Sequence, residues 1–134
     1  MSSFISTLLR SPERSHRLVN RRNDAVVATV VTTAVDSSSR RRGLLGLNEM
    51  PVGQALIIAP CYAIHTWFMR FDIDVVFVTR RGEVIKRVDT VSPWRMAVAW
   101  RAFAVIELAA GALRASGTGK GDIVEVVPEE SAIP

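Results

Sequence analysis

Cysteine and long hydrophobic runs are both scarce in this chain of 134 residues. The single cysteine, Cys61, excludes an intrachain disulfide, so the fold does not depend on an oxidising compartment. The longest weakly polar stretch, residues 52–64, is interrupted by Gln54 and Pro60 and falls short of the roughly 20 apolar residues that a membrane helix needs. The start of the chain also lacks the basic segment and the apolar core of a signal peptide. We therefore expect no membrane span and a cytoplasmic location.

Lysine is scarce among the basic residues. Of the 17 lysines and arginines, only Lys86 and Lys120 are lysines. The net charge is +4, a sign that suits anionic partners. The arginines stand in short groups at residues 21–22, 40–42 and 80–81, and these groups fall in different segments rather than along one stripe. We interpret them as a solvated basic surface, and we do not expect a nucleic-acid partner.

Hydrophobic residues make up 49% of the chain, which is enough for a packed core. The length suits one domain, and the sequence contains no internal repeat. We predict a flexible leader over residues 1–15, one globular domain over residues 16–127 and a flexible, acidic tail over residues 128–134.

Most of the expected elements are strands, because β-branched and apolar residues gather in short runs separated by turn residues. Asn23 and Asp24 favour a turn between the first two runs, which would then form a hairpin. A helix is expected after Asp36, whose carboxylate can accept hydrogen bonds from the first turn, although Gly43 could end that helix early. The strands are expected at residues 16–19, 25–33, 55–59, 65–71, 73–79, 84–88, 103–108 and 122–127, and the helices at residues 37–47 and 111–116.

The clearest supersecondary pattern is a second hairpin. Two segments with strand composition, residues 75–79 and 84–88, flank a short segment that contains Gly82. Glycine readily adopts the positive φ that a tight turn requires. Residues 92–102 fit either an extended segment or a short helix, and both interpretations stay open.

A glycine-rich segment and a cysteine–histidine pair resemble functional motifs. The glycines at 117, 119 and 121 suggest a phosphate-binding loop, but a strand rather than a helix is expected after them, so a turn is favoured. Cys61 and His65 have the spacing of a thiolate–imidazole pair only on a helix, which Pro60 disfavours. We therefore expect Cys61 to behave as a small buried hydrophobe.

Three carboxylates could carry chemistry. Asp72 and Asp74 would share one face of an extended strand and could hold a cation, but capping or salt bridges explain them more simply. Glu107 lies inside an apolar run, where a carboxylate costs free energy unless it is paired. Glu107 either faces solvent or meets Arg40 or Arg42, or else it is an acid with a perturbed pKa in a pocket. We expect no metal and no cofactor.

Seven short strings in this sequence occur in a recognisable order. They are Arg40-x-x-Gly43-Leu44-Leu45, His65-Thr66-Trp67-Phe68-Met69, Asp74-Val75-Val76-Phe77-Val78, Gly82-Glu83-Val84, Pro93-Trp94-Arg95, Glu107-Leu108-x-x-Gly111 and Gly121-Asp122. In order and spacing, the set resembles the bacterial and archaeal domain-of-unknown-function family number 192 over residues 25–127. The resemblance implies an α+β fold that is mainly antiparallel β, with a small barrel-like sheet and one or two short helices. It implies no reaction, because none is established for that family.

The polar residues of these strings are the natural lining of any site that the family shares. They are Arg40, His65, Trp67, Asp74 and Glu107. The leading hypothesis is a binding module for a small polar or anionic ligand, in which Arg40 pairs with an anion and Trp67 stacks. The carboxylates of Asp74 and Glu107 would accept hydrogen bonds from the ligand.

Two other functions stay open. In a hydrolase-like enzyme, Glu107 and Asp74 would act as acid and base, which requires that the two carboxylates converge in a cleft. In an interaction scaffold, Trp94, Met96 and Trp100 would form an exposed contact patch for a protein partner. An exposed apolar surface at these three residues would favour the scaffold.

Overall fold

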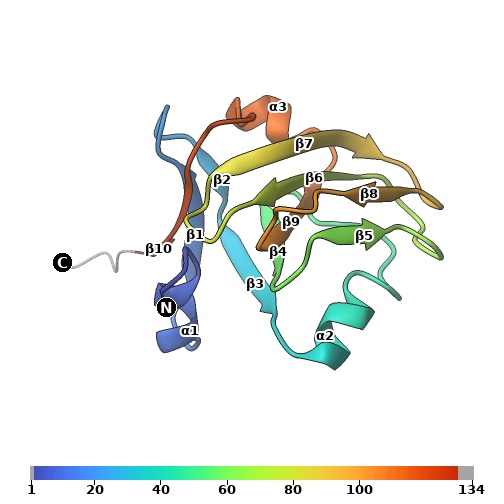
Figure 1. Ribbon diagram of the computed structural model, residues 1–134, viewed down its shortest axis with the longest axis horizontal. Helices are drawn as coiled ribbons and strands as arrows, with labels where there is room; N and C mark the ends of the chain where they lie inside the picture. The colour runs from blue at the N-terminus through green and yellow to red at the C-terminus, as the bar shows by residue number, and fades with distance from the viewer. Residues whose placement is uncertain (1, 130–134) are drawn as a thin grey trace.

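The computed structural model describes residues 2–129, and a five-stranded mixed sheet lies at its centre (Figure 1). Only β3 and β4 are parallel to each other, and the other neighbours pair antiparallel. Two parallel strands in one sheet need a crossover, and residues 35–53 supply it. In order across the sheet, the strands are β3 (Val30–Ala34), β4 (Gln54–Ile58), β9 (Ala104–Ala109), β6 (Ile73–Val78) and β7 (Val84–Val91).

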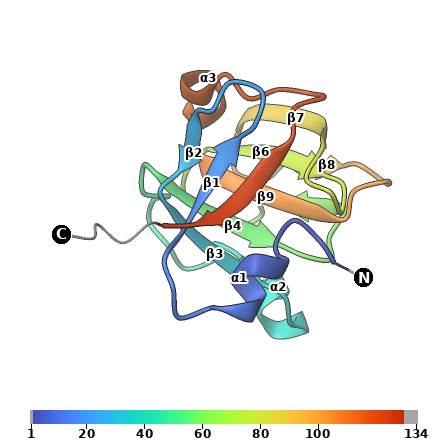
Figure 2. The same ribbon diagram turned by 90° about the vertical axis from the view of Figure 1, so that its left-hand side faces the viewer.

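One face of this sheet packs against a second, three-stranded sheet and two short helices. The second sheet has the order β10 (Val124–Pro128), β1 (His16–Asn20) and β2 (Val26–Ala28). Helices α1 (Ser6–Arg10) and α3 (Ala112–Ser116) close the ends of this layer (Figure 2). The larger of two hydrophobic cores lies here and receives side chains from both sheets and both helices.

The opposite face of the central sheet is covered less completely. A two-stranded ribbon of β5 (Ala63–His65) and β8 (Met96–Val98) lies over it, together with α2 (Ser37–Arg42). A second core forms between these elements and the sheet, with Ile58, Phe77 and Val105 on the sheet side and Ile64 on the ribbon. A cavity remains between α2 and the ribbon.

The two central strands, β9 and β6, are buried along their whole length. Side chains of a strand alternate between the two faces of its sheet, so both faces of these strands need apolar residues. Each strand nevertheless contains one carboxylate, Glu107 in β9 and Asp74 in β6. The register pairs Glu107 with Val75 and Asp74 with Leu108, and direct partners point to the same face. Asp74 and Glu107 therefore point to opposite faces of the sheet.

The structure confirms the α+β class, the predominance of antiparallel strands and both predicted hairpins. Strands β1 and β2 pair antiparallel, and so do β6 and β7. Gly82 has the expected positive φ in the turn between β6 and β7. The predicted barrel-like sheet does not close: between residues 2 and 129, the strands form two sheets and a separate ribbon rather than a barrel.

Three predicted elements depart most from the structure. The strand expected at residues 25–33 is divided at Thr29, so that β2 and β3 belong to different sheets. The strand expected at residues 65–71 ends at His65, since the chain then turns through Phe68, which has a φ of 67°. Helix α2 stops at Arg42 because Gly43, with a φ of 46°, leaves the helical region.

The predicted flexible leader, residues 1–15, contains helix α1 within its described part, residues 2–15. Ile5 and Leu8 of this segment are buried in the larger core, and the N–H of Phe4 donates to the carbonyl of Arg80. A sequence pattern of only two buried positions is too short to predict such docking. Of the predicted tail, Pro128 ends β10 and Glu129 donates its N–H to Ser15, while residues 130–134 lie outside the described residues. None of the helices in residues 2–129 has the length and apolar character to cross a bilayer.

Candidate functional site

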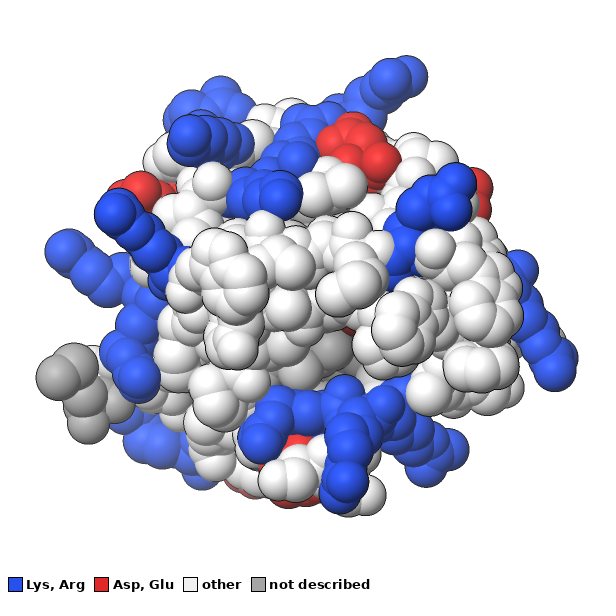
Figure 3. All heavy atoms as spheres, turned by 45° about the vertical axis from the view of Figure 1, so that its right-hand side comes forward, with Lys and Arg blue, Asp and Glu red and all other residues white. Residues whose placement is uncertain are grey.

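A cavity of about 360 Å³ lies between α2 and the β5–β8 ribbon, on the less covered face of the central sheet. Its walls are largely apolar and include Leu44, Ile58, Ile64 and Met69. In Figure 3 this face shows a hollow in a broad uncharged area, with a group of basic side chains along its lower edge. Pockets that hold small ligands are concave and mostly apolar, with a few polar groups in fixed positions.

Glu107 supplies a polar group to this cavity from the central strand β9. The residue is 4% exposed, and its Oε2 atom has no hydrogen-bond partner in residues 2–129. Two expectations for Glu107 were exposure to solvent and an ion pair with Arg40 or Arg42. Both are wrong, because Glu107 is buried and forms no ion pair with either arginine in the described chain. A buried polar group without a partner calls for an explanation, since it costs free energy in the folded state.

The apolar surroundings of Glu107 change its protonation. Burial raises the pKa of the Glu107 carboxyl to about 7, because the charged form loses its hydration. Near neutral pH, this group is therefore divided between a carboxylic acid and a carboxylate. The acid form can donate one hydrogen bond, whereas the carboxylate only accepts.

Three consecutive arginines of α2 lie at the rim of the cavity. Helix α2 begins at its N-cap Asp36, whose Oδ1 accepts a hydrogen bond of 2.8 Å from the Ser39 N–H. Arg40 donates to the carbonyl of Val35 at 2.5 Å, which holds its guanidinium against the start of the helix. Arg41 and Arg42 are exposed and form no ion pair with any residue between 2 and 129. Among the described residues, the rim thus presents two cations, Arg41 and Arg42, that have no ion-pair partner.

His65 lines the cavity from the end of β5, and the ring of Trp67 packs against the ring of His65. The two rings stack with centroids 4.6 Å apart and planes 25° from parallel. Trp67 does not line the cavity and is partly exposed. It is thus a packing partner of His65 rather than a contact of anything inside the cavity.

Cys61 also lines the cavity, although the sequence spacing disfavoured a shared site with His65. Cys61 is half-buried, and its thiol donates to the carbonyl of Ala63 at 3.1 Å. Burial raises the pKa of this thiol, and the nearby Glu107 acts in the same direction. A nucleophilic thiol needs a lowered pKa, so this environment does not activate Cys61.

Asp74 lies on the other side of the sheet, away from the cavity. It is fully buried, and its two oxygens accept hydrogen bonds of 2.9–3.1 Å from the backbone N–H groups of Thr90, Gly111 and Leu113. This carboxylate joins the end of β7 to the start of α3. Asp74 and Glu107 therefore do not converge, and the geometry removes the paired carboxylates that a hydrolase-like mechanism required.

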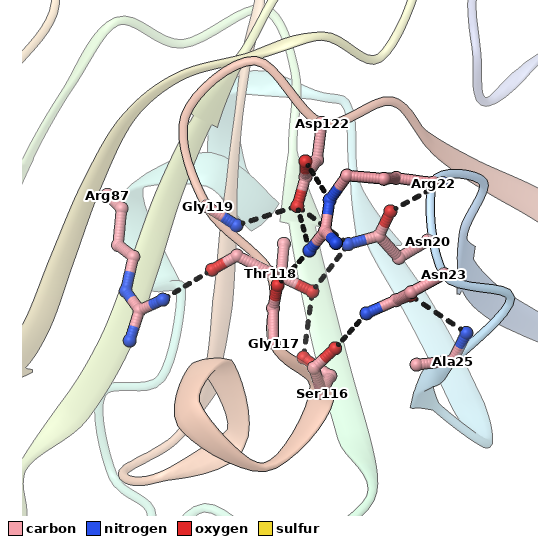
Figure 4. Close-up of polar contacts among 10 residues, drawn as sticks. All are labelled: Asn20, Arg22, Asn23, Ala25, Arg87, Ser116, Gly117, Thr118, Gly119 and Asp122. Atoms are coloured by element: carbon pink, nitrogen blue, oxygen red, sulfur yellow. Dashed lines mark hydrogen bonds and ion pairs between the residues drawn. The ribbon is translucent and has the colours of Figure 1, made fainter.

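A second polar cluster surrounds Asp122 and is satisfied internally (Figure 4). Asp122 accepts hydrogen bonds from Asn20 at 2.9 Å, Gly119 N–H at 2.9 Å and Arg22 at 2.7 Å. These contacts, led by the hydrogen bond from Arg22, lower the pKa of the Asp122 carboxyl to about 2. The glycine-rich segment at 117–121 thus forms a turn that ties α3 and β10 to β1, as the turn interpretation expected.

The structure therefore brings three of the five predicted site residues to one cavity. Arg40, His65 and Glu107 line it, whereas Trp67 stands behind His65 and Asp74 faces the opposite core. No group of three or more His, Cys, Asp or Glu side chains within residues 2–129 has a geometry that could hold a metal ion. Arg41, Cys61 and the apolar walls were not among the predicted site residues. The arginine triplet at residues 40–42, directly before Gly43, could have indicated Arg41.

Two solved structures share this fold. A candidate transcription regulator from Sinorhizobium meliloti 1021 aligns with a TM-score of 0.70, at 21% identity, over 83% of this chain and 91% of that chain. A protein of unknown function from Novosphingobium aromaticivorans DSM 12444 aligns with a TM-score of 0.70, at 20% identity, over 82% of each chain. At such identities the similarity concerns the fold alone.

No curated protein sequence matches this chain. A family model, by contrast, matches most of it. The model of domain-of-unknown-function family 192, described as Uncharacterized ACR, matches residues 18–126, which include the cavity, the five-stranded sheet and the ribbon. This chain therefore belongs to domain-of-unknown-function family 192.

Proposed function

We propose that this protein binds a small anionic molecule in the cavity above Glu107. The observation that carries the proposal is the buried carboxyl of Glu107, which lines the cavity and whose Oε2 has no partner in the described chain. A ligand group at this position would satisfy the unpartnered atom. A cavity of about 360 Å³ also lies within the size range that is usual for small-molecule sites.

The three parts of the cavity indicate the chemistry of the ligand. At the rim, Arg41 and Arg42 favour a carboxylate or a phosphate, which guanidinium groups bind in a bidentate manner. The apolar walls, Ile58 and Met69 among them, suit a short hydrocarbon body. At the floor, Glu107 favours a second polar group that can exchange a hydrogen bond with it.

The protonation of Glu107 determines how affinity depends on pH. An anionic ligand prefers the neutral acid, which donates a hydrogen bond and does not repel a negative charge. Only the protein molecules with a protonated Glu107 are then competent to bind, and the apparent affinity falls with that fraction. With a pKa of about 7, this fraction falls roughly tenfold between pH 6 and pH 8.

The first experiment is a thermal-shift screen at pH 6 with mono- and dicarboxylic acids and phosphate monoesters, followed by calorimetry of any probe that raises the Tm. We expect the wild-type protein to bind a monocarboxylic acid, which carries the same charge at both pH values, about tenfold more weakly at pH 8 than at pH 6. Glu107→Gln keeps a neutral donor, so it should bind equally at both pH values. Glu107→Leu has no polar group and should lose binding.

The arginine rim is tested with the double variant Arg41→Gln and Arg42→Gln. We expect it to weaken binding of the same probe at least fivefold, which corresponds to about 1 kcal/mol. The matched control is Arg10→Gln with Arg81→Gln, which removes two exposed arginines that do not line the cavity. A screen without any shift, or a shift that Glu107→Leu retains, would contradict the proposal.

A further inference from the structure

The free end of the β5–β8 ribbon carries apolar side chains that point into solvent. Trp67 and Phe68 lie in the loop after β5, and Trp94 and Met96 lie before and at the start of β8. Phe68, Trp94 and Met96 are 70%, 57% and 63% exposed. These four residues are called the ribbon tip below. In Figure 1 the two loops form the right-hand extremity of the molecule.

The backbone holds this arrangement at positions where aromatic residues rarely occur. Phe68 and Trp94 have φ values of 67° and 66°, in the left-handed region that bulky L-residues avoid. Their rings contact each other, with centroids 4.7 Å apart. Such conformations persist only where surrounding structure enforces them, and they gather at functional positions.

Thr66 is the residue that enforces the shape of the ribbon tip. It is fully buried, and its hydroxyl donates to the carbonyl of Ser92 at 2.6 Å and accepts from the N–H of Arg95 at 2.9 Å. Its carbonyl accepts from the N–H groups of Met69 and Trp94. One buried side chain thus fixes both loops, so the exposed rings are held in place rather than left to pack against the domain.

The charge around the ribbon tip is positive. The two loops of the tip, residues 66–72 and 92–95, contain the exposed arginines Arg70 and Arg95 and one exposed carboxylate, Asp72. None of these three side chains forms an ion pair within the described chain. Apolar rings bordered by unneutralised cations are the features with which proteins bind the surface of an anionic bilayer.

We propose that the ribbon tip docks onto the surface of a membrane that contains anionic lipids. The rings would enter the headgroup region, and the flanking arginines would contact lipid phosphates. This proposal goes beyond ligand binding at Glu107 and does not depend on it. Two copies of the chain would place these arginines against each other, which disfavours self-association through the tip.

The test is co-sedimentation with phosphatidylcholine vesicles, with and without phosphatidylglycerol at one lipid in four. We expect the protein to bind the anionic vesicles preferentially and less strongly at high salt, with quenching of its tryptophan emission by brominated lipid. The double variant Phe68→Asn and Trp94→Asn should reduce the bound fraction at least fivefold. Asparagine is chosen because it tolerates positive φ, so the loops keep their backbone conformation.

The matched control is Trp100→Asn, which removes a 77% exposed ring at the other end of the ribbon. This variant should bind vesicles like the wild type, and circular dichroism should show that all variants are folded. Three results would overturn the proposal: no binding to anionic vesicles, equal binding to neutral vesicles, or full binding by the double variant. It would also be overturned if the ribbon tip were needed for dimerisation or for binding an oligonucleotide while vesicles remained unbound.

Discussion

At the scale of single residues, two buried carboxylates in neighbouring strands have opposite environments. Asp74 accepts three backbone hydrogen bonds, which is the usual way in which a protein satisfies a buried acid. The Oε2 of Glu107 accepts none from the described chain and lies in an apolar cavity. Asp74 is therefore explained by the fold, whereas Glu107 is not, and this difference makes Glu107 the centre of the candidate site.

The raised pKa of Glu107 predicts how stability depends on pH. Between its ordinary value of 4.5 and its folded value of about 7, only the folded state holds the proton, so stability falls as pH rises through this window. The full loss is roughly 3 kcal/mol. Glu107→Gln removes the titration, so its stability relative to wild type should increase from pH 5 to pH 8.

Urea unfolding at both pH values measures this change. Asp72→Asn is the control, since Asp72 is an exposed carboxylate and the substitution should change stability equally at both pH values. If the difference between Glu107→Gln and wild type were the same at pH 5 and pH 8, the carboxyl would not be buried as described.

At the scale of elements, the turn between β6 and β7 depends on one glycine. Gly82 has a φ of 87°, and its carbonyl accepts a hydrogen bond of 2.9 Å from the N–H of Val124. A Cβ atom at this position would collide with the carbonyl oxygen of Val124. The turn is therefore shaped by its contact with the first residue of β10 as much as by its own conformation.

Gly82→Ala should consequently destabilise the protein by about 2–4 kcal/mol, through positive φ and through the collision together. Gly46→Ala is the matched control, because Gly46 has a φ of 88° and nothing within 4 Å of an added Cβ. It should cost only about 1 kcal/mol, the strain of positive φ alone. Equal losses of the two variants in urea unfolding would show that the contact with Val124 does not matter.

Element boundaries show where local sequence patterns no longer predict the ends of strands. Residues 25–33 are rich in β-branched residues, yet the chain bends at Thr29 and the two halves join different sheets. The apolar run after His65 has strand composition, but the hydrogen bonds of Thr66 turn it into a loop. Composition predicts an extended preference, whereas the partners of the backbone groups decide where a strand ends.

At the scale of the whole molecule, the cluster around Asp122 joins distant parts of the chain. Asp122 is 7% exposed and connects β1 and its turn with the segment between α3 and β10. Because the pKa of Asp122 is lowered to about 2, its contribution to stability is present above pH 4 and is lost as pH falls from about 4 to about 2.

Asp122→Ala should therefore lower stability by about 1–3 kcal/mol at pH 7, and the loss should shrink toward pH 2. Half of the Arg22 side chain is exposed, so water moderates the effect. Glu125→Ala is the matched control, since Glu125 pairs with Arg21 on the surface and should cost less than about 0.5 kcal/mol. Thermal unfolding at pH 7 and pH 2.5 separates the two, and equal small losses would contradict the role of Asp122.

The sequence by itself determined the fold class, the hairpin at Gly82, the helix N-cap at Asp36 and the family resemblance, because these depend on local patterns of residue type. It also selected Arg40, His65 and Glu107, which converge on one cavity. Tertiary structure alone decided that Asp74 faces the opposite core, because the face of a side chain follows from strand register, and register is set by partners far along the chain. The burial of Glu107, the rim of arginines and the exposed ribbon tip likewise depend on which segments the folded chain places side by side.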